Sequence, residues 1–301
     1  MMELPQPKPK KNCRLARDLP LPIVFKKDGT LKTFAACFNG FSVTVANPED
    51  MKTLISKGYF GKANLSRSHP QFSRGDNIQI VRQRQLTVRK ACSEQFAIKM
   101  KPEKVIVVPD SDSENDYFTN LRPKYAIDNS CLKEELWLGL EEAFFLTSVV
   151  KCLNVSFEGE IASIEKLWGL FQNAQPNFTR NYVVYFYYRC KNWVVKPGIK
   201  FGGDFMLYKE GPSFYHSTYI VVIDVVDTAG KRIESLTNRS MDNISILGLN
   251  RLCETAGKDL LICRLKWPQN SAVTYEDLTN IEIQEILVKR WIASQERGDT
   301  A

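Results

Sequence analysis

The chain has 301 residues, of which 44% are hydrophobic and 25% are charged, so it is long enough for one large domain or two compact ones. It contains no apolar run of about 18 residues and no apolar signal core at its N-terminus, so neither a membrane-spanning nor a secreted protein is expected. The net charge is +7, but residues 1–100 hold 18 Lys and Arg against 7 Asp and Glu, whereas the remainder holds 23 against 27. This asymmetry indicates either a basic surface for a polyanion or a solvated basic face.

The histidines and cysteines exclude several classes of enzyme. Two histidines, His69 and His216, cannot build a His-rich metal site or the HExxH helix of a metalloprotease. None of the eight cysteines has Cys-x-x-Cys spacing, so we expect small core residues in a reducing, intracellular compartment instead of a zinc ribbon or a thioredoxin-like site. The sequence also lacks a Walker or Rossmann glycine loop and a Gly-x-Ser-x-Gly elbow.

The first hundred residues are predicted to contain a tail and a small folded domain. Residues 1–20 are rich in Pro and Lys and are expected to be disordered, and their lysines also fit a nuclear-import patch. Residues 21–100 are expected to form a basic N-terminal domain. Within it, residues 33–45 have the composition of β-structure, and a short helix is predicted over 51–57 with Asn47 as its cap.

Residues 101–131 are predicted to be an acidic linker. Within them, the apolar run 105–108 precedes an acidic, serine-containing run at 109–114. This order resembles a SUMO-interacting strand followed by casein-kinase-type serines. The ordinary alternative is a solvated acidic linker with one short strand, and the sequence leaves both interpretations open.

Residues 132–295 are predicted to fold as a domain of the α/β (α+β) class, followed by a tail over 296–301. Helices are expected at 133–153, 164–171 and 244–255, and strands at 193–195, 204–208, 215–224, 259–267 and 281–292. Residues 177–190 are ambiguous, because their Tyr and Val content favours a strand whereas several aromatic residues share a helical face. The order of elements indicates a mixed sheet flanked by helices.

Residues 188–220 contain a long ordered motif. They read Tyr-Arg-Cys-Lys-Asn-Trp, then Val-Lys-Pro-Gly-Ile-Lys-Phe-Gly-Gly-Asp-Phe, then a tyrosine and a histidine. This succession resembles the signature of the tRNA-splicing endonuclease catalytic subunits, with Asn192 where the signature usually has Gly. The run Gly-Tyr-Phe-Gly-Lys at 58–62 and the run 140–146 resemble the subunit type that cuts the 5′ splice site. The family resemblance therefore predicts a C-terminal splicing-endonuclease nuclease domain.

The resemblance implies a site of five residues. It places the catalytic tyrosine, histidine and lysine of the family at Tyr208, His216 and Lys258, and the two residues that clamp a bulged base at Arg251 and Trp291. Each of these residues also has an ordinary interpretation when taken singly. A lone histidine is more often structural, a strand tyrosine or a tryptophan more often packs in a core or interface, and a lysine at a helix end is more often solvated. Only their joint order within the motif favours the catalytic interpretation.

The implied chemistry is attack of an RNA 2′-hydroxyl on the adjacent phosphate, which leaves a 2′,3′-cyclic phosphate and a 5′-hydroxyl. Such a step needs a base, an acid and a cation, roles that the resemblance gives to Tyr208, His216 and Lys258, and it needs no metal or other cofactor. A tyrosine with an ordinary pKa of about 10 is a poor base at neutral pH. We therefore expect the cations of Lys258 and Arg251 to lower the pKa of Tyr208.

The resemblance further implies pre-tRNA as the substrate and a heterotetramer with structural subunits and a second catalytic subunit, with an RNA 5′-kinase as an associated enzyme. We expect the strand over 281–292 to be the pairing edge for a structural partner. A nuclear location is expected, with the mitochondrial outer surface as the alternative. Three other functions stay open: a non-catalytic RNA-binding or scaffold subunit of the same complex, a metal-dependent DNA nuclease, and a SUMO- or RNA-binding regulator with an inert domain.

Overall fold

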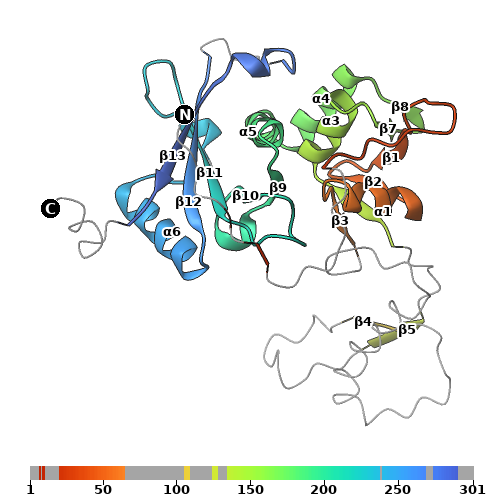
Figure 1. Cartoon of the computed structure of the whole chain (residues 1–301), viewed down its shortest axis with the longest axis horizontal. Coiled ribbons are helices and arrows are strands. Elements are labelled where there is room, and N and C mark those ends of the chain that lie inside the picture. The colour runs from red at the N-terminus through yellow and green to blue at the C-terminus, as the bar shows by residue number, and fades with distance from the viewer. Residues whose placement is uncertain are drawn as a thin grey trace, which may run out of the picture. The chain divides into compact units, whose positions relative to one another are not determined.

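The computed structural model describes residues 7, 9–10, 20–64, 105–108, 124–127, 134–237, 239–268 and 274–290. The chain divides into two compact units, residues 63–135 and residues 1–62 together with 136–301. In the unit 63–135, β4 (Val105–Val108) pairs antiparallel with β5 (Lys124–Ile127) (Figure 1). The apolar run 105–108 is thus a strand, while the acidic run 109–114 lies outside the described residues.

The first part of the larger unit is an N-terminal lobe built on a six-stranded mixed sheet in the order β3-β6-β2-β1-β7-β8. Its strands are β1 (Phe34–Phe38), β2 (Val43–Val45), β3 (Lys62–Ala63), β6 (Leu136–Leu138), β7 (Leu153–Phe157) and β8 (Glu160–Ile161). β1 alternates between buried and exposed residues, the pattern of a half-buried strand. The side chain of Asn47 accepts backbone hydrogen bonds at the start of α1 (Pro48–Ser56), which confirms the predicted cap.

This sheet joins segments that are far apart in the sequence. β1 pairs in parallel with β7, and β2 pairs antiparallel with β6. The division expected from the sequence, an N-terminal domain over 21–100 and a catalytic domain over 132–295, therefore differs from the structure, in which one lobe takes strands from both segments. Strand pairing over a long sequence separation is a non-local choice that local composition does not encode.

The helix predicted over 133–153 is wrong in its extent. The structure instead has β6, then α3 (Leu140–Ser148), then β7. Leu136 and Leu138 are buried while Trp137 between them is exposed, which is the alternation of a strand, and Gly139 is the N-cap of α3. The apolar spacing of the helix continues into both strands, so periodicity alone missed the boundaries. α4 (Ile164–Ala174) confirms the next predicted helix.

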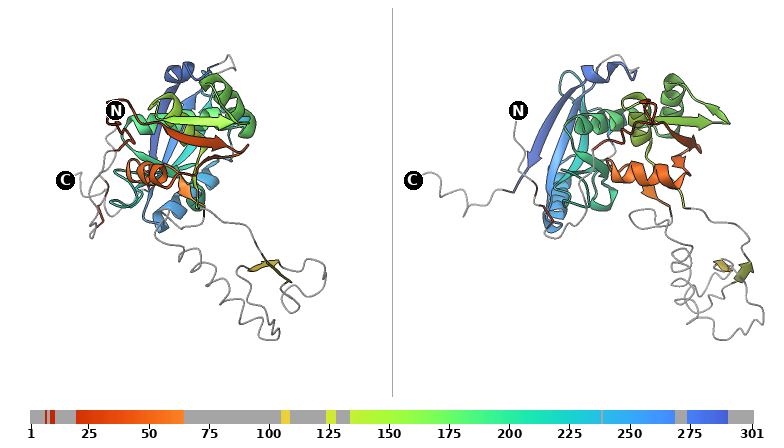
Figure 2. Two further views of the ribbon diagram at one scale, coloured as in Figure 1. Left: turned by 90° about the vertical axis from the view of Figure 1, so that its right-hand side faces the viewer. Right: turned by 45° about the vertical axis from the view of Figure 1, so that its right-hand side comes forward.

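The C-terminal lobe has a five-stranded sheet in the order β13-β12-β11-β10-β9, with α5 (Phe178–Cys190) on one face and α6 (Asn243–Thr255) on the other (Figures 1 and 2). The strands are β9 (Val194–Pro197), β10 (Phe205–Tyr208), β11 (Tyr219–Val226), β12 (Asp259–Lys266) and β13 (Glu282–Val288). Along β11, Tyr219 and Val221 join the core on the α5 side, whereas Ile220 and Val222 join the core on the α6 side. The predicted α/β class is confirmed.

α5 resolves the ambiguous segment 177–190 as a helix whose aromatic face is central to the core. The ring centroids of Phe144 and Tyr182 are 4.9 Å apart, and those of Trp168 and Phe178 are 5.1 Å apart. Aromatic pairs of this kind contribute about 0.5–1.5 kcal/mol each beyond the burial of their area. The same hydrophobic cluster continues into the five-stranded sheet, so α5 fixes that sheet against the N-terminal lobe.

Candidate active site

At one end of the five-stranded sheet, the ends of three neighbouring strands lie side by side. Leu207 of β10 pairs with Tyr219 of β11, and Tyr219 pairs with Asp259 of β12. Tyr208 ends β10 and Lys258 directly precedes β12, so both residues lie next to these paired residues at the same end of the sheet. The structure therefore brings together two of the predicted site residues that are far apart in the sequence.

His216 lies at the same end of the sheet, in the connection between β10 and β11. The backbone N–H groups of Phe214 and Tyr215 donate to the carbonyl of Gly211 at 3.2 and 3.0 Å, which closes the turn. His216 itself is exposed, whereas its neighbours Tyr215 and Ser217 are buried. The backbone is thus anchored on both sides while the imidazole faces the solvent.

Ser217 connects Lys258 and Tyr208 at this end of the sheet, and the sequence alone did not identify it. Its carbonyl accepts a hydrogen bond from the Nζ of Lys258 at 3.3 Å, and its side chain acts to lower the pKa of Tyr208 against the larger effect of burial. It also follows His216 directly in the chain. The signal available in the sequence is a pair of small polar residues, Ser217 and Thr218, between the histidine and the apolar strand β11.

The surroundings of Tyr208 disfavour its phenolate. Burial raises the pKa of Tyr208 above its ordinary value, and the hydrogen bond with Ser217 acts in the opposite, weaker direction. The expectation that Lys258 and Arg251 lower the pKa of Tyr208 is therefore wrong for the substrate-free chain. The reason is geometric, because the Lys258 ammonium donates to the Ser217 carbonyl and Arg251 is exposed on α6.

Lys258 is positioned by the end of α6. Gly257 has a φ of 64°, the left-handed conformation that ends helices and favours glycine, and the N–H of Lys258 donates to the carbonyl of Cys253 at 2.9 Å. The ammonium lies 5.0 Å from the ring centroid of Phe201. Burial lowers the pKa of Lys258 because it disfavours the charged form. A bound phosphate anion would offset that loss of hydration.

The two predicted base-clamping residues differ in what the structure describes. Arg251 is exposed on α6, the helix that leads to Lys258. Trp291 lies outside the described residues, as does His69, so the place of Trp291 in the site stays a prediction.

The described ranges offer neither a metal cluster nor a membrane-spanning helix. There, no group of three or more His, Cys, Asp or Glu side chains is placed to hold a metal ion. Nor does that part of the chain contain a helix whose length and apolar character would carry it across a bilayer.

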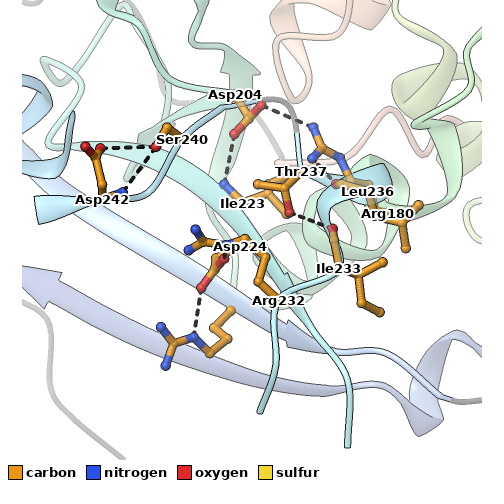
Figure 3. A network of polar contacts seen from close by, with 11 residues as sticks. Arg180, Asp204, Ile223, Asp224, Arg232, Ile233, Leu236, Thr237, Ser240 and Asp242 are labelled. Atoms are coloured by element: carbon orange, nitrogen blue, oxygen red, sulfur yellow. Dashed lines mark hydrogen bonds and ion pairs between the residues drawn. The ribbon is translucent and has the colours of Figure 1, made fainter. Parts of the chain in front are cut away.

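The opposite end of the sheet carries a network of paired charges (Figure 3). Asp204, which precedes β10, accepts a hydrogen bond from the N–H of Ile223 at 2.8 Å. The same carboxylate lies 3.5 Å from a guanidinium nitrogen of Arg180 on α5 and 3.6 Å from one of Arg239. The aspartate of the motif is therefore structural, because it ties β10 to β11 and to the helix behind them.

Asp224 on β11 forms the second part of this network. It is 0% exposed, and its two carboxylate oxygens accept hydrogen bonds at 2.9 Å from Arg232 and from Arg264. A buried carboxylate needs such partners, because burying a charge without them is costly. This end of the sheet is thus internally compensated.

Comparison with known proteins adds to this geometry. Residues 178–275 match the family described as tRNA intron endonuclease, catalytic C-terminal domain. The matched segment makes up about a third of the 301 residues. It contains Tyr208, His216, Arg251 and Lys258 and ends before Trp291.

Several tRNA-splicing endonuclease subunits are similar to the chain. Subunit Sen2 of Gallus gallus is 41% identical over 170 residues, which cover 55% of this chain and 36% of that protein. Subunit Sen2-2 of Arabidopsis thaliana is 28% identical over 176 residues, or 56% of this chain and 65% of the relative. The probable subunit sen2 of Schizosaccharomyces pombe is 24% identical over 331 residues, which cover 85% of this chain and 84% of that protein. The chain thus spans only about a third of the Gallus gallus relative, 36% by that alignment.

Proposed function

We propose that this chain is a catalytic subunit of a tRNA-splicing endonuclease and that it cleaves intron-containing pre-tRNA at the 5′ splice site. The observation that carries the proposal is that Tyr208 ends β10 and Lys258 precedes β12 at the same end of the sheet, with His216 three residues before β11 between them in the chain. All three lie in the segment that matches the family. The Sen2 names of the relatives support the choice of subunit type.

The reaction uses the nucleophile that RNA itself carries. The 2′-oxygen attacks the adjacent phosphorus as its O–H bond breaks, and the bond from phosphorus to the 5′-oxygen of the next nucleotide breaks. Tyr208 takes the proton of the 2′-hydroxyl, and His216 gives a proton to the leaving 5′-oxygen. Lys258 stabilises the negative charge of the phosphorane. The products are a 2′,3′-cyclic phosphate and a 5′-hydroxyl, and the scheme uses no metal ion or cofactor.

The raised pKa of Tyr208 defines how this base works. At neutral pH only a small fraction of molecules carries the phenolate, since burial favours the neutral phenol. The phenolate that does form is a correspondingly stronger base, and the rate depends on the product of its amount and its strength.

Substrate recognition is proposed to use the helix that leads to the catalytic lysine. Arg251 is exposed on α6, where its guanidinium can stack on a base that is splayed out of an RNA bulge. Trp291 is proposed as the second face of this clamp. Contacts of this kind contribute roughly 1–3 kcal/mol per stacked base.

Assembly is proposed to involve the outer strand of the C-terminal lobe. Among the described strands of that sheet β13 is at the edge, and it carries Ile283 and Ile286 as half-buried apolar residues. An edge strand offers unpaired backbone groups to a partner chain. We propose a heterotetramer with structural subunits and a second catalytic subunit, associated with an RNA 5′-kinase and located in the nucleus.

The test is cleavage of an intron-containing pre-tRNA by the reconstituted complex in EDTA, with analysis of the RNA ends. His216→Ala is expected to reduce the 5′ cut by about 10²–10⁴-fold, the usual contribution of a general acid, while the 3′ cut continues. His69→Ala is the matched control, because it removes the other histidine of the chain, and it should cut like the wild type.

The alternative functions give different outcomes. If His216→Ala cuts both boundaries at wild-type rates, the chain is a non-catalytic scaffold or RNA-binding subunit. A pre-tRNA with a 2′-deoxy group at the 5′ boundary must resist cleavage if the 2′-oxygen is the nucleophile. Cleavage of that substrate would instead favour a nuclease of the DNA-cutting type.

A further inference from the structure

A turn of the N-terminal lobe, formed by Gly-Tyr-Phe-Gly at residues 58–61, touches the turn that leads to His216. Gly211 has a φ of 117°, and a Cβ atom at this position would overlap the ring of Tyr59. Tyr59 is 9% exposed, so most of its surface is in contact with protein. The carbonyl of the same Gly211 accepts the two hydrogen bonds that close the turn before His216. The contact is therefore one turn of backbone away from the imidazole.

The 58–61 turn is itself held firmly by charged side chains of other elements. Arg189 of α5 donates to the carbonyl of Gly58 at 2.9 Å. Lys196 of β9 donates to the carbonyl of Gly61 at 3.0 Å, and the carboxylate of Glu142 accepts from the N–H of Gly61 at 2.9 Å. Hydrogen bonds that involve charged groups are stronger than neutral ones. Both ends of the turn are thus fixed, and it presents Tyr59 from a rigid base.

The backbone of Tyr59 is in a conformation that is unfavourable for its residue type. Its φ is 60°, in the left-handed region where a bulky side chain is uncommon and where glycine would be unstrained. Such conformations persist only when the surrounding structure determines them, and they concentrate at functional places. An aromatic ring kept there at a cost indicates that the contact made by the ring matters.

A cavity lies beside the contact between Tyr59 and Gly211. The cavity has a volume of about 560 Å³ and is lined by Tyr59 and, on the turn between β10 and β11, by Lys209, Glu210 and Phe214. The turn therefore has reduced packing on this side, because close-packed neighbours are replaced by open space. The ring of Tyr59 packs on Gly211 at one side of the turn, while Lys10 donates hydrogen bonds to the carbonyls of Pro212 and Phe214 at 2.6 and 2.8 Å. Of these contacts, the ring of Tyr59 is the one that lies against the residue whose carbonyl closes the turn.

We propose that Tyr59 is a positioning residue for catalysis: its ring fixes Gly211, and Gly211 in turn fixes the place of His216. This inference rests on the proposed function, since it assigns His216 a proton transfer that requires accurate placement. It also gives the motif at 58–62 a role, because the N-terminal lobe then contributes to the chemistry of the C-terminal lobe without touching the RNA. Misplacement of a reacting group by about 1 Å can reduce a rate by about 10²-fold.

The kinetic test compares Tyr59→Ala with Tyr59→Phe in the reconstituted complex. Both variants keep a non-glycine residue at the strained position, so the backbone cost is the same and only the ring differs. Tyr59→Ala is expected to lower kcat for the 5′ cut by about 10- to 100-fold with KM for pre-tRNA within about twofold of wild type. Tyr59→Phe is expected to stay within about threefold of wild type in both constants, because it retains the ring.

A stability control separates positioning from general weakening of the lobe. Leu54→Ala removes a fully buried side chain from α1 of the same lobe and keeps the backbone carbonyl that accepts from the N–H of Phe60 at 3.0 Å. It should lower the melting temperature at least as much as Tyr59→Ala but leave kcat unchanged at a temperature well below melting. If the two variants lose kcat in proportion to their melting temperatures, the role of Tyr59 is only structural and the proposal fails.

A measurement without substrate separates this proposal from the proposed function. The chain has two histidines, so the imidazole signals in an NMR spectrum of the full chain can be assigned with His216→Ala. Tyr59→Ala should shift or broaden the signal of His216, whereas Tyr59→Phe and Leu54→Ala should preserve it. An unchanged His216 signal in Tyr59→Ala overturns the positioning role. A wild-type complex that fails to cut pre-tRNA overturns the proposed function, whatever the spectrum shows.

Discussion

The two ends of the five-stranded sheet treat ionisable groups in opposite ways. At the end drawn in Figure 3, Asp224 is completely buried and is shared by Arg232 and Arg264. At the other end, burial raises the pKa of Tyr208 and lowers that of Lys258, so both groups are shifted towards their uncharged forms. A charge that finds its counter-ion inside the chain stabilises the fold, whereas a group dominated by burial is suited to a partner that comes from outside.

Within this comparison of the two ends, the largest effect is expected for Lys258, and Lys266 at the other end of β12 serves as its control. Lys258→Ala should reduce the 5′ cut by about 10²–10³-fold, the usual loss when one charge-stabilising donor is removed from a transition state. Lys266→Ala, at the other end of the strand, removes an exposed lysine paired with Glu282 and should change the rate less than about twofold. Single-turnover cleavage of pre-tRNA measures both. Equal losses in the two variants would mean that the ends are not distinct in function.

The next effect concerns stability at the compensated end. Asp224→Ala leaves two arginines without their shared carboxylate, and the free energy of unfolding should fall by about 2–3 kcal/mol. This is less than the loss for a fully buried pair, because both arginines reach the solvent. Glu282→Ala, in an exposed pair, should cost less than about 1 kcal/mol. Urea unfolding of the full chain decides, and the contrast between the two ends is weakened if both substitutions cost the same.

The pH dependence of the rate sharpens the assignment at the active end. Because the pKa of Tyr208 is raised, its phenolate fraction increases about tenfold per pH unit throughout the neutral range. The rate should therefore rise with pH until the general acid loses its proton, and then level off, since the gain in base cancels the loss of acid. A residue that only donates a hydrogen bond predicts the opposite shape, flat at low pH and falling later. A falling profile in single-turnover assays would remove Tyr208 from the role of base.

The smallest effect is expected at the outer edge of the sheet. Ile286→Ala on β13 should weaken binding of a structural partner about fivefold, the equivalent of about 1 kcal/mol of lost apolar burial, and leave the rate of the assembled complex unchanged. Ile283→Ala should behave similarly. Co-purification at decreasing concentrations measures the effect. Undiminished recovery of the partner would contradict the assignment of β13 as an assembly edge.

The candidate active site could be predicted from the sequence further than the lobe that supports it. The motif at 188–220 is continuous in the chain, and the glycine after α6 is a local signal that placed Lys258 at the start of a strand. The strand predicted over 215–224 begins later, at Tyr219, because residues 211–217 form the closing turn. Local patterns thus predicted the elements and left their ends open.

What the sequence did not reveal depends on contacts between distant residues. The direction of the pKa shift of Tyr208 follows from how deeply that side chain is buried, which no motif states. Ser217 gains its importance only when the end of β10, the turn before β11 and the start of β12 meet, because its backbone carbonyl accepts from Lys258. Tyr59 and Gly211 are separated by about half of the chain, so their contact emerges only from the packed fold.

The pairing of β1 and β2 with β7 and β6 also has an evolutionary consequence. At the boundary of residues 63–135, the N–H of Asn64 donates to the carbonyl of Glu135 at 3.1 Å, and the N–H of Glu135 donates to the side chain of Asn64 at 3.0 Å. The chain therefore leaves the sheet after β3 and returns to it before β6 at one pair of hydrogen-bonded residues, Asn64 and Glu135. Because the two ends of this segment are held together, an insertion or deletion between Asn64 and Glu135 need not disturb β3 or β6. This is a position at which the gene can lengthen or shorten while the nuclease fold is inherited intact.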